Sequence, residues 1–169
     1  PPRSELAATT AAKAIGPGAP AKIALDARYL YGAPAAELGV EGDVIVKPAE
    51  NGLAGFPGYR FGLADDPATP VRRPLLDLLR TDAKGKATVT VGLPDVEPST
   101  KPQVADIVLR VREPGGRAVE TTVTLPVVAG GDRIGVKPLF PDDRIGEGGT
   151  AAFEVIAVDG AGRRAALAG

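Results

Sequence analysis

Residues 105–127, ADIVLRVREPGGRAVETTVTLPV, decide the fold class of this chain. Every second residue from Ala105 to Val111 is apolar, and a similar alternation returns from Val119 to Val127, with charged residues and threonines between. The central sequence EPGG, at 113–116, is typical of a turn. A period of two on both sides of a turn predicts an antiparallel hairpin with one buried face.

The same alternation occurs upstream of the hairpin, in residues 23–31, 40–47 and 87–93. Turn sequences rich in Gly, Pro and Asp separate these segments, and residues 82–85 (DAKG) are the clearest of them. Strand-like segments at roughly ten-residue spacing predict an all-β fold. We therefore expect an antiparallel β-sandwich of the fibronectin III or immunoglobulin-like type.

Two segments are ambiguous. Residues 6–15 are rich in Ala and Thr, and they fit either an amphipathic helix or an edge strand that stops at the Gly- and Pro-containing residues 16–20. Residues 74–79 (PLLDLL) fit either a helical turn or a strand. We favour the strand because the segment is too short for a self-supporting helix.

Residues 48–70 interrupt the rhythm, because Pro and Gly recur throughout them. This stretch also holds Phe56, Tyr59 and Phe61, from a chain with only three Tyr and four Phe. A loop of this length is unusual inside a compact domain. We expect its aromatic residues to fold it back over the sandwich.

Gly130-Gly131 marks a boundary. Beyond it, residues 134–139 and 152–158 each predict a strand, and a third could start near Arg163. About 40 residues are too few for an independent core. We therefore expect three parts, which are a linker or edge strand at 1–19, a sandwich domain at 20–129, and the opening strands of a second sandwich at 130–169.

The apolar residues of this tail cannot be buried by two strands alone; they are Ile134, Val136, Phe153, Val155 and Ile156. Three outcomes are open, since the tail can dock on the first sandwich, pair with the tail of another molecule, or remain mobile. Unpaired strand edges seek partners. We therefore favour self-association through residues 132–169, as a product of truncation.

The composition excludes several function classes. Lys and Arg number 20 and Asp and Glu number 21, so the net charge of −1 argues against a nucleic-acid face and against a polybasic membrane contact. The chain has no Cys and no His, which excludes disulfides, thiolate nucleophiles, iron–sulfur clusters and a Ser-His-Asp triad. It begins with Pro1 and has no Met, so we expect a fragment of a longer protein.

Two acid pairs and one Gly-rich stretch are candidate sites. Asp65-Asp66 and Asp142-Asp143 carry the oxygens that Ca²⁺ or Mg²⁺ would take, but without EF-hand spacing they fit solvated loop acids better. Residues 146–149 (GEGG) lack both the Gly-Lys-Ser/Thr of a phosphate-binding loop and the strand–turn–helix frame of a dinucleotide site.

Aromatic and basic residues give no stronger candidate. Tyr29, Tyr31 and Tyr59 fit packing residues better than a ligand platform. Arg72-Arg73 fits a solvated pair better than a nucleic-acid contact. We predict no catalytic, cofactor-binding or metal-ligating residue, no cofactor, and no enzymatic activity.

The order of several motifs carries a family resemblance. The motifs are RYLYGAPAA (28–36), FPGYRFGLAD (56–65), TDAKGKA (81–87), VREPGGRAV (111–119) and IGVKPLF (134–140). This series resembles the macroglobulin-like β-sandwich domains of bacterial alpha-2-macroglobulins over roughly residues 20–158. YLYGAPAA and FPGYRFGL are its most specific parts.

The resemblance implies a segment of a large protease-trapping protein of the bacterial periplasm or cell envelope. Such proteins are chains of macroglobulin-like domains with a bait region and, often, a thioester domain. The thioester pattern Cys-x-x-Glu-Gln cannot occur without Cys, so no functional residue of the family transfers to this chain. The resemblance implies a non-catalytic spacer whose partners are neighbouring domains, with proteases met only through the intact parent.

A carbohydrate- or adhesin-type binding sandwich of the envelope is the alternative, since one fold hosts many functions. An exposed aromatic platform would favour it, whereas burial of Tyr29, Tyr31, Phe56 and Tyr59 would favour the spacer. A carboxylate-dependent enzyme, the third class, would need two acids facing each other across a cleft.

Overall fold

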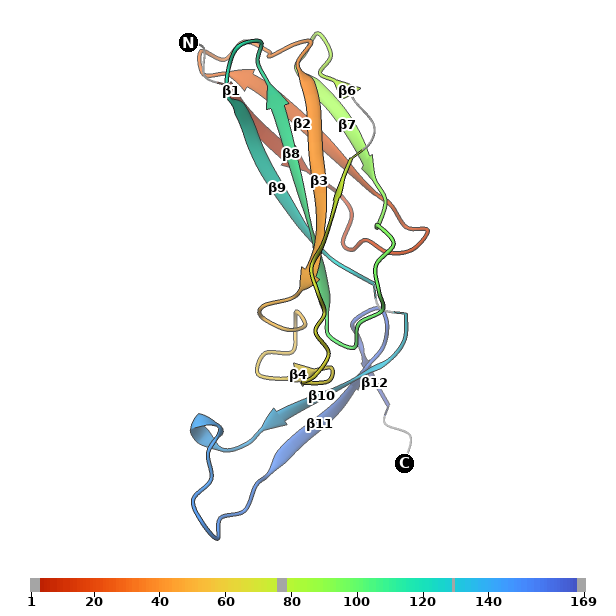
Figure 1. The fold of residues 1–169 in the computed structure, drawn as a ribbon, viewed down its shortest axis with the longest axis vertical. Helices are drawn as coiled ribbons and strands as arrows, with labels where there is room; N and C mark the ends of the chain where they lie inside the picture. Colours follow the sequence, from red (N-terminus) through yellow and green to blue (C-terminus); the bar gives the residue numbers. More distant parts are fainter. Residues whose placement is uncertain (1–3, 76–78, 129, 167–169) are drawn as a thin grey trace. The chain divides into compact units, whose positions relative to one another are not determined.

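The computed structural model describes residues 4–75, 79–128 and 130–166, and Figure 1 shows their fold. The described chain is all-β, with three antiparallel sheets and no α-helix, as the sequence predicts. Its elements in chain order are β1 (Ser4–Thr9), β2 (Ala21–Tyr29), β3 (Gly39–Pro48), β4 (Arg60–Phe61), β5 (Val71–Pro74), β6 (Leu79–Arg80), β7 (Lys86–Val91), β8 (Gln103–Arg112), β9 (Ala118–Pro126), β10 (Arg133–Pro138), the 3₁₀ turn η1 (Pro141–Asp143), β11 (Phe153–Val158) and β12 (Arg164–Ala165).

The chain divides into two compact units. Unit 1 consists of the described residues of 1–47, 70–96 and 104–127, and unit 2 consists of those of 48–69, 97–103 and 128–169. The sequence predicts one division of the chain, at residue 130. In the structure, residues 48–69 and 97–103 belong to the same unit as the tail, so the two units alternate along the chain.

Unit 1 is a two-sheet sandwich. One sheet has the order β1-β2-β7 and the other has the order β5-β3-β8-β9, with β6 also paired to β3. Apolar side chains from both sheets form one core that includes Ile23, Leu25, Val46, Val91, Ile107, Leu109 and Val111. The period-two alternation in the sequence therefore identifies the buried face of each central strand correctly.

The hairpin of residues 105–127 is confirmed. β8 and β9 pair in an antiparallel register that sets Val111 opposite Val119 and Ala105 opposite Leu125. The turn closes with a hydrogen bond from Gly116 N to Glu113 O at 3.0 Å. Ala105 and Val111 are fully buried, because the inward face of β8 packs into the core.

The turn before β7 has the geometry that its sequence, DAKG at residues 82–85, predicts. Asp82 Oδ1 accepts hydrogen bonds from Lys84 N at 2.8 Å and from Lys86 N at 2.9 Å. Gly85 has a φ of 74°, and a Cβ there would lie 2.3 Å from Ala27 O. Asp and Gly are therefore both required by the geometry of this turn.

The N-terminal segment is an edge strand, and its helical alternative is wrong. β1 pairs antiparallel with β2 from Ser4 opposite Tyr29 to Thr9 opposite Ala24. Further along, Ile15 is fully buried and its N donates to Pro126 O at 2.9 Å.

The favoured strand at residues 74–79 is described only at its ends. β5 ends at Pro74 and β6 begins at Leu79, whereas residues 76–78 lie outside the described residues. Both strands pair with β3. The flanking residues therefore agree with an extended chain.

Unit 2 is a sheet of order β12-β11-β10-β4 built from distant parts of the sequence. β10 pairs with β11, where Val136 lies opposite Val155, and with β4, where Gly135 lies opposite Phe61. The expectation that residues 48–70 fold over the sandwich is wrong, since residues 48–69 join unit 2. The reason is apolar complementarity, because Phe61 clusters with Ile156 of the tail.

The strands expected in the tail are present, and β10 finds a partner strand in its own chain. Both edges of β10 are used, one by β11 and the other by β4. One face of this sheet still leaves Ile134, Phe153 and Val155 about half exposed. Self-association through residues 132–169 stays a prediction, and it would have to use this face or the outer edges of the sheet.

Candidate functional site

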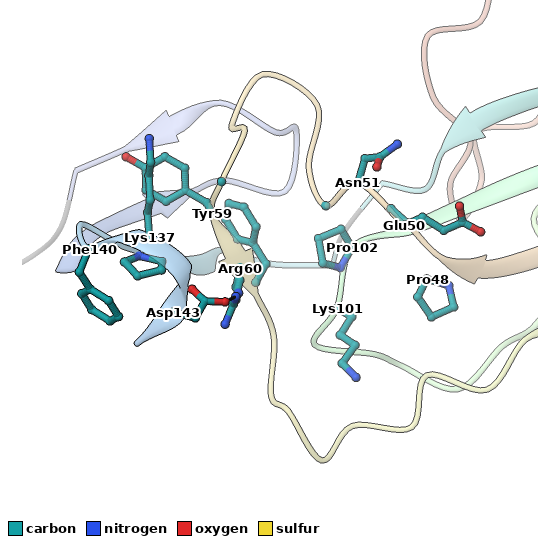
Figure 2. A pocket seen from close by; sticks show the side chains of 15 residues that line it. Pro48, Glu50, Asn51, Tyr59, Arg60, Lys101, Pro102, Lys137, Phe140 and Asp143 are labelled. Carbon is teal, nitrogen blue, oxygen red and sulfur yellow. Dashed lines mark hydrogen bonds and ion pairs between the residues drawn. The ribbon is translucent and has the colours of Figure 1, made fainter. Parts of the chain in front are cut away.

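The best candidate for a site in unit 2 is a hollow of about 600 Å³ beside β4 (Figure 2). Residues 48–52, 58–61, 101–102, 137–138, 140 and 143 supply its wall. Three cationic side chains line it, which are Arg60, Lys101 and Lys137.

The aromatic residues of the FPGYRFGL motif form the apolar side of this region. The Phe56 ring meets the rings of Tyr59 and Phe61 edge-on, each at a centroid distance of 6.3 Å. Phe61 packs with Ile156 and Val158, which are almost completely buried. The motif is thus the apolar nucleus of unit 2, and edge-on aromatic pairs add to the area that it buries.

Glycines make this close packing possible. A Cβ at Gly135 of β10 would lie 2.6 Å from the Phe61 ring. Gly62 has a φ of 83°, and a Cβ there would lie 2.7 Å from the Thr100 carbonyl group. Only glycine fits these two positions without movement of the neighbouring groups.

The polar side chains around the hollow are already engaged with one another. Lys137 Nζ lies 5.6 Å from the centroid of the Tyr59 ring. A hydrogen bond to the Glu154 carboxylate raises the pKa of Tyr59. Figure 2 shows Arg60 and Asp143 directed toward each other, and they form an ion pair. Arg60 and Lys137 therefore connect the β4 segment with η1 and β10.

The acid pair Asp65-Asp66 is divided between two environments. Asp65 is exposed, whereas Asp66 Oδ2 accepts hydrogen bonds from Thr100 N and Thr100 Oγ1, both at 2.7 Å, and from Ser99 Oγ at 3.0 Å. Asp66 Oδ1 accepts from Ala68 N at 2.9 Å. These donors, Thr100 first, lower the pKa of Asp66 to about 2. The carboxylate connects two loops, which is a structural use.

The second acid pair and the Gly-rich stretch lie on one exposed connection. Asp142 and Asp143 follow β10, and Asp143 is the ion-pair partner of Arg60. Residues 146–149 form a turn closed by Gly149 N and Gly146 O at 2.9 Å. Across residues 4–75, 79–128 and 130–166, no three acidic side chains gather where they could hold a metal ion.

Arg72 and Arg73 are both exposed, which agrees with a solvated pair, but Arg72 also forms an ion pair on the sheet surface. Arg72 Nη2 and Arg110 Nη1 each lie 2.7 Å from Asp43 Oδ2, and Arg110 Nε lies 2.7 Å from Glu120 Oε2. This chain of charges crosses four neighbouring strands, β5, β3, β8 and β9. Hydrogen bonds from Arg72 and then Arg110 lower the pKa of Asp43 to about 2.

A second set of polar contacts lies on the same strands. Lys47 Nζ lies 2.9 Å from Asp106 Oδ2, and Thr124 Oγ1 donates to Asp106 Oδ1 at 2.7 Å. Sequence alone could not find these groups, because the partners are far apart in the chain and only the strand register brings them together. Alternating charge on outward positions of the predicted strands was the available signal.

Two of the tyrosines stack at the end of β2. The rings of Tyr29 and Tyr31 are nearly parallel, 7° apart, with centroids separated by 5.4 Å. Tyr29 is half-buried, but Tyr31 is 74% exposed. Phe56 and Tyr59 are half-buried. Burial thus favours the spacer interpretation at three of the four aromatic positions, and Tyr31 is the exception.

A family model, the bacterial alpha-2-macroglobulin MG5 domain, matches residues 2–128. The chain belongs to the bacterial alpha-2-macroglobulin family. The alpha-2-macroglobulin of Xylella fastidiosa (strain Temecula1) is 30% identical over 164 residues, which are 95% of this chain and 10% of that protein. The chain thus spans about a tenth of the length of the curated alpha-2-macroglobulins that it matches.

Two solved structures of Escherichia coli alpha-2-macroglobulin share the fold. The native conformation matches with a TM-score of 0.69 and 23% identity, covering 96% of this chain and 11% of that one. The form activated by porcine elastase matches with a TM-score of 0.70 and 25% identity, covering 96% and 14%. Each match covers more of this chain than residues 2–128, the part that matches the MG5 family model. In the described part of this chain, no helix is long and apolar enough to cross a membrane.

Proposed function

We propose that this segment is a non-catalytic structural and interaction module of a large bacterial alpha-2-macroglobulin-like protease inhibitor, where it helps to build the protease-trapping cage. The match of residues 2–128 to the MG5 domain carries the proposal. The side-chain chemistry supports it, because Asp43, Asp66 and Arg60 join strands and loops rather than converge on an open reaction centre.

The comparison with Escherichia coli alpha-2-macroglobulin adds support for a spacer. This chain matches the native and elastase-activated forms almost equally, with TM-scores of 0.69 and 0.70. A module that keeps its fold while the inhibitor is activated would give that result. The chemistry of trapping would then reside in other parts of the parent protein.

The family membership supports the rest of the proposal. The module would lie in the periplasm or cell envelope, contact neighbouring macroglobulin-like domains, and meet proteases only through the intact parent. Its domain plan would be an edge strand at 1–19, a sandwich at 20–129, and the first strands of a second sandwich at 130–169. The near-zero net charge supports neither nucleic-acid nor membrane partners.

Inhibition assays with the purified 169-residue chain test the proposal. We expect no hydrolase activity and no stoichiometric inhibition of serine, cysteine or metalloproteases. In the parent protein, replacement of this segment by an unrelated sandwich should abolish trapping while leaving peptide-bond cleavage of the parent by the protease unchanged. Stoichiometric inhibition by the isolated chain would contradict the spacer function.

The exposed Tyr31 ring favours a second candidate, a carbohydrate- or adhesin-type binding module of the envelope. Its ring is 74% exposed and is supported from behind by Tyr29. A supported aromatic face can stack on the apolar face of a ligand at low entropic cost. Titration of the chain with envelope glycans, with Tyr31→Ala as the control, distinguishes this function from the spacer.

A further inference from the structure

The connection between β10 and β11 is the longest exposed segment of the described chain (Figure 1). Every residue from Pro141 to Phe153 is exposed, a far longer run than any other in the described residues. Two turn hydrogen bonds lie within it, from Arg144 N to Pro141 O at 3.3 Å and from Gly149 N to Gly146 O at 2.9 Å. Asp143 in this segment also forms an ion pair with Arg60, but both side chains are exposed and such a pair contributes little, so the segment opens locally at little cost.

The two ends of this connection contact each other, although its middle residues are exposed. Leu139 N donates to Ala152 O at 2.9 Å, and the rings of Phe140 and Phe153 meet edge-on at 5.4 Å. Below them, β10 and β11 pair from Pro138 opposite Phe153 onward. The sheet therefore does not depend on the tip of the connection.

Arg144 itself has the extended backbone that a serine protease binds, whereas Asp142 and Asp143 before it have positive φ values of 57° and 51° and must rearrange on docking. The Arg144 φ of −131° and ψ of 140° are those of an extended strand, and extended peptides dock by main-chain hydrogen bonds. Its cationic side chain suits an S1 pocket with an acidic residue at its base. The next residue, Ile145, is not proline, so the bond that follows Arg144 is open to attack.

We propose that the Arg144–Ile145 bond is a limited-proteolysis site for serine proteases of trypsin-like specificity. Hydrolysis would break the bond between Arg144 C and Ile145 N. One water molecule would supply the hydroxyl to the new Arg144 carboxyl group and the proton to the new Ile145 amine. This proposal concerns the loop itself and does not depend on the proposed cage function.

Other cationic positions are poorer substrates for identifiable reasons. Arg73, Lys101 and Lys137 each precede a proline, whose ring blocks the attacked bond. Lys84 lies in the tight turn that Asp82 closes by hydrogen bonds. Such positions need more extensive opening before a protease can bind than the exposed turn at Arg144 does.

Two exposed competitors lie in unit 1, and a third, Arg163 of unit 2, is held in a turn where its N donates to Asp159 Oδ1 at 2.9 Å. Arg117 is exposed but belongs to the short turn between β8 and β9, which is too tight to extend into a protease cleft. Lys13 is exposed two residues before the fully buried Ile15, which anchors that segment. Both residues provide matched controls for Arg144.

Cleavage at this bond should leave the molecule assembled. β10 stays on the piece with residues 1–144 and β11 on the piece with residues 145–169, and their six paired positions are outside the connection. The apolar packing of Phe61 with Ile156 also joins the two pieces. The nicked chain should therefore separate only under denaturing conditions.

Limited digestion of the full 169-residue chain with bovine trypsin tests the site. We expect the first products to be residues 1–144 and 145–169 by mass spectrometry, co-eluting with intact protein in native size-exclusion chromatography. Arg144→Gln and Ile145→Pro should each slow the loss of intact chain by about tenfold or more, because the remaining sites need local opening. Arg117→Gln should leave that rate unchanged.

The dependence of the cleavage rate on urea concentration distinguishes cleavage of the accessible loop from cleavage that requires global unfolding. The rate at Arg144–Ile145 should stay constant below the unfolding transition, since a loop that is already accessible gains nothing from denaturant. A first cut after Lys13 or Arg117, an unchanged rate for both Arg144→Gln and Ile145→Pro, or a rate that rises with urea from the start would each overturn the proposal.

Discussion

Units 1 and 2 are both built from antiparallel strands, but they are stabilised in different ways. In unit 1, side chains such as Ile23 and Leu109, from opposite sheets, share one continuous core. In unit 2 the buried cluster consists of Phe61, Ile156 and Val158 with partly buried neighbours. The stability of unit 1 therefore comes from repeated apolar burial along its strands, whereas that of unit 2 comes from a few contacts between segments distant in sequence.

The largest loss of stability should follow a cavity in unit 1. Leu109 is fully buried, so Leu109→Ala removes its packing and leaves a void that rigid sheets cannot fill. We expect the free energy of unfolding to fall by about 2–5 kcal/mol, measured by urea denaturation. Val123→Ala, at a half-buried position on β9, should cost less. Equal midpoints for both variants and the wild type would contradict the assigned faces.

A somewhat smaller loss should follow the corresponding change in unit 2. Phe61→Ala removes the ring that packs on Gly135 and Ile156. We expect hydrogen-exchange protection of the β10 and β11 amides to fall by roughly 2–4 kcal/mol, since few other contacts compensate. The β8 and β9 amides should keep their protection. Equal losses in both pairs of strands would show that the two units do not differ in this way.

Sequence predicted unit 1 much better than unit 2, and the reason is the range of the interactions. The period of two in β2, β3, β7 and β8 is a local signal, and it identified their buried faces. The pairing of β4 with β10 depends on residues more than 70 positions apart, such as Phe61 and Gly135. No local pattern in residues 48–69 shows which strand they will pair with.

Two glycines of unit 1 share the same local backbone conformation but differ in the groups that surround them. Gly85 and Gly115 both have positive φ, 74° and 70°, but a Cβ at Gly85 would meet Ala27 O at 2.3 Å, whereas one at Gly115 meets nothing within 4 Å. Gly85→Ala should therefore cost about 2–3 kcal/mol and Gly115→Ala about 1 kcal/mol. Thermal unfolding of both variants measures the difference, and equal costs would rule out the steric contribution.

Charged groups allow a comparison of the two units as pH falls. The pKa values of Asp43 and Asp66 are both lowered to about 2 from the ordinary 3.8. Each carboxylate therefore stabilises the folded state above pH 4, and this contribution is lost as pH falls from about 4 to 2. Asp43→Asn should cost about 1 kcal/mol at pH 7, and the cost should disappear near pH 2.

The stabilising effects of the two carboxylates should differ in their dependence on added salt. Asp43 is held by the cations Arg72 and Arg110, whereas Asp66 is held by the neutral donors Thr100 and Ser99. At about 1 M NaCl, screening should reduce the cost of Asp43→Asn and leave that of Asp66→Asn unchanged. Urea denaturation at low and high salt measures both. The same salt dependence in the two variants would contradict this difference in cause.

The candidate-site residues were harder to predict than the strands, for a related reason. Asp66 looked like one half of an acid pair, but Thr100 and Ser99, which use its oxygens, lie more than 30 positions away. Arg72 is exposed, as the sequence predicts, but its ion-pair partner Asp43 lies on a strand that sequence alone could not align with it. The residue types at these positions indicate polar contacts, but the partner residues can be identified only when the strand register and loop positions are known.

The smallest effect on stability should come from the exposed face of unit 2, where the effect on association should be largest. Val155 is 46% exposed and lies opposite Val136 in the β10–β11 register. Val155→Thr keeps the β-branched shape, so it should change the free energy of unfolding by less than about 0.5 kcal/mol. Exposed apolar patches promote association, so the wild-type chain should show concentration-dependent self-association through residues 132–169, weaker in the variant. Size-exclusion chromatography with light scattering measures both. A wild-type chain that stays monomeric over the whole concentration range would show that the contacts of β10 with β4 and β11 satisfy the tail without a second molecule.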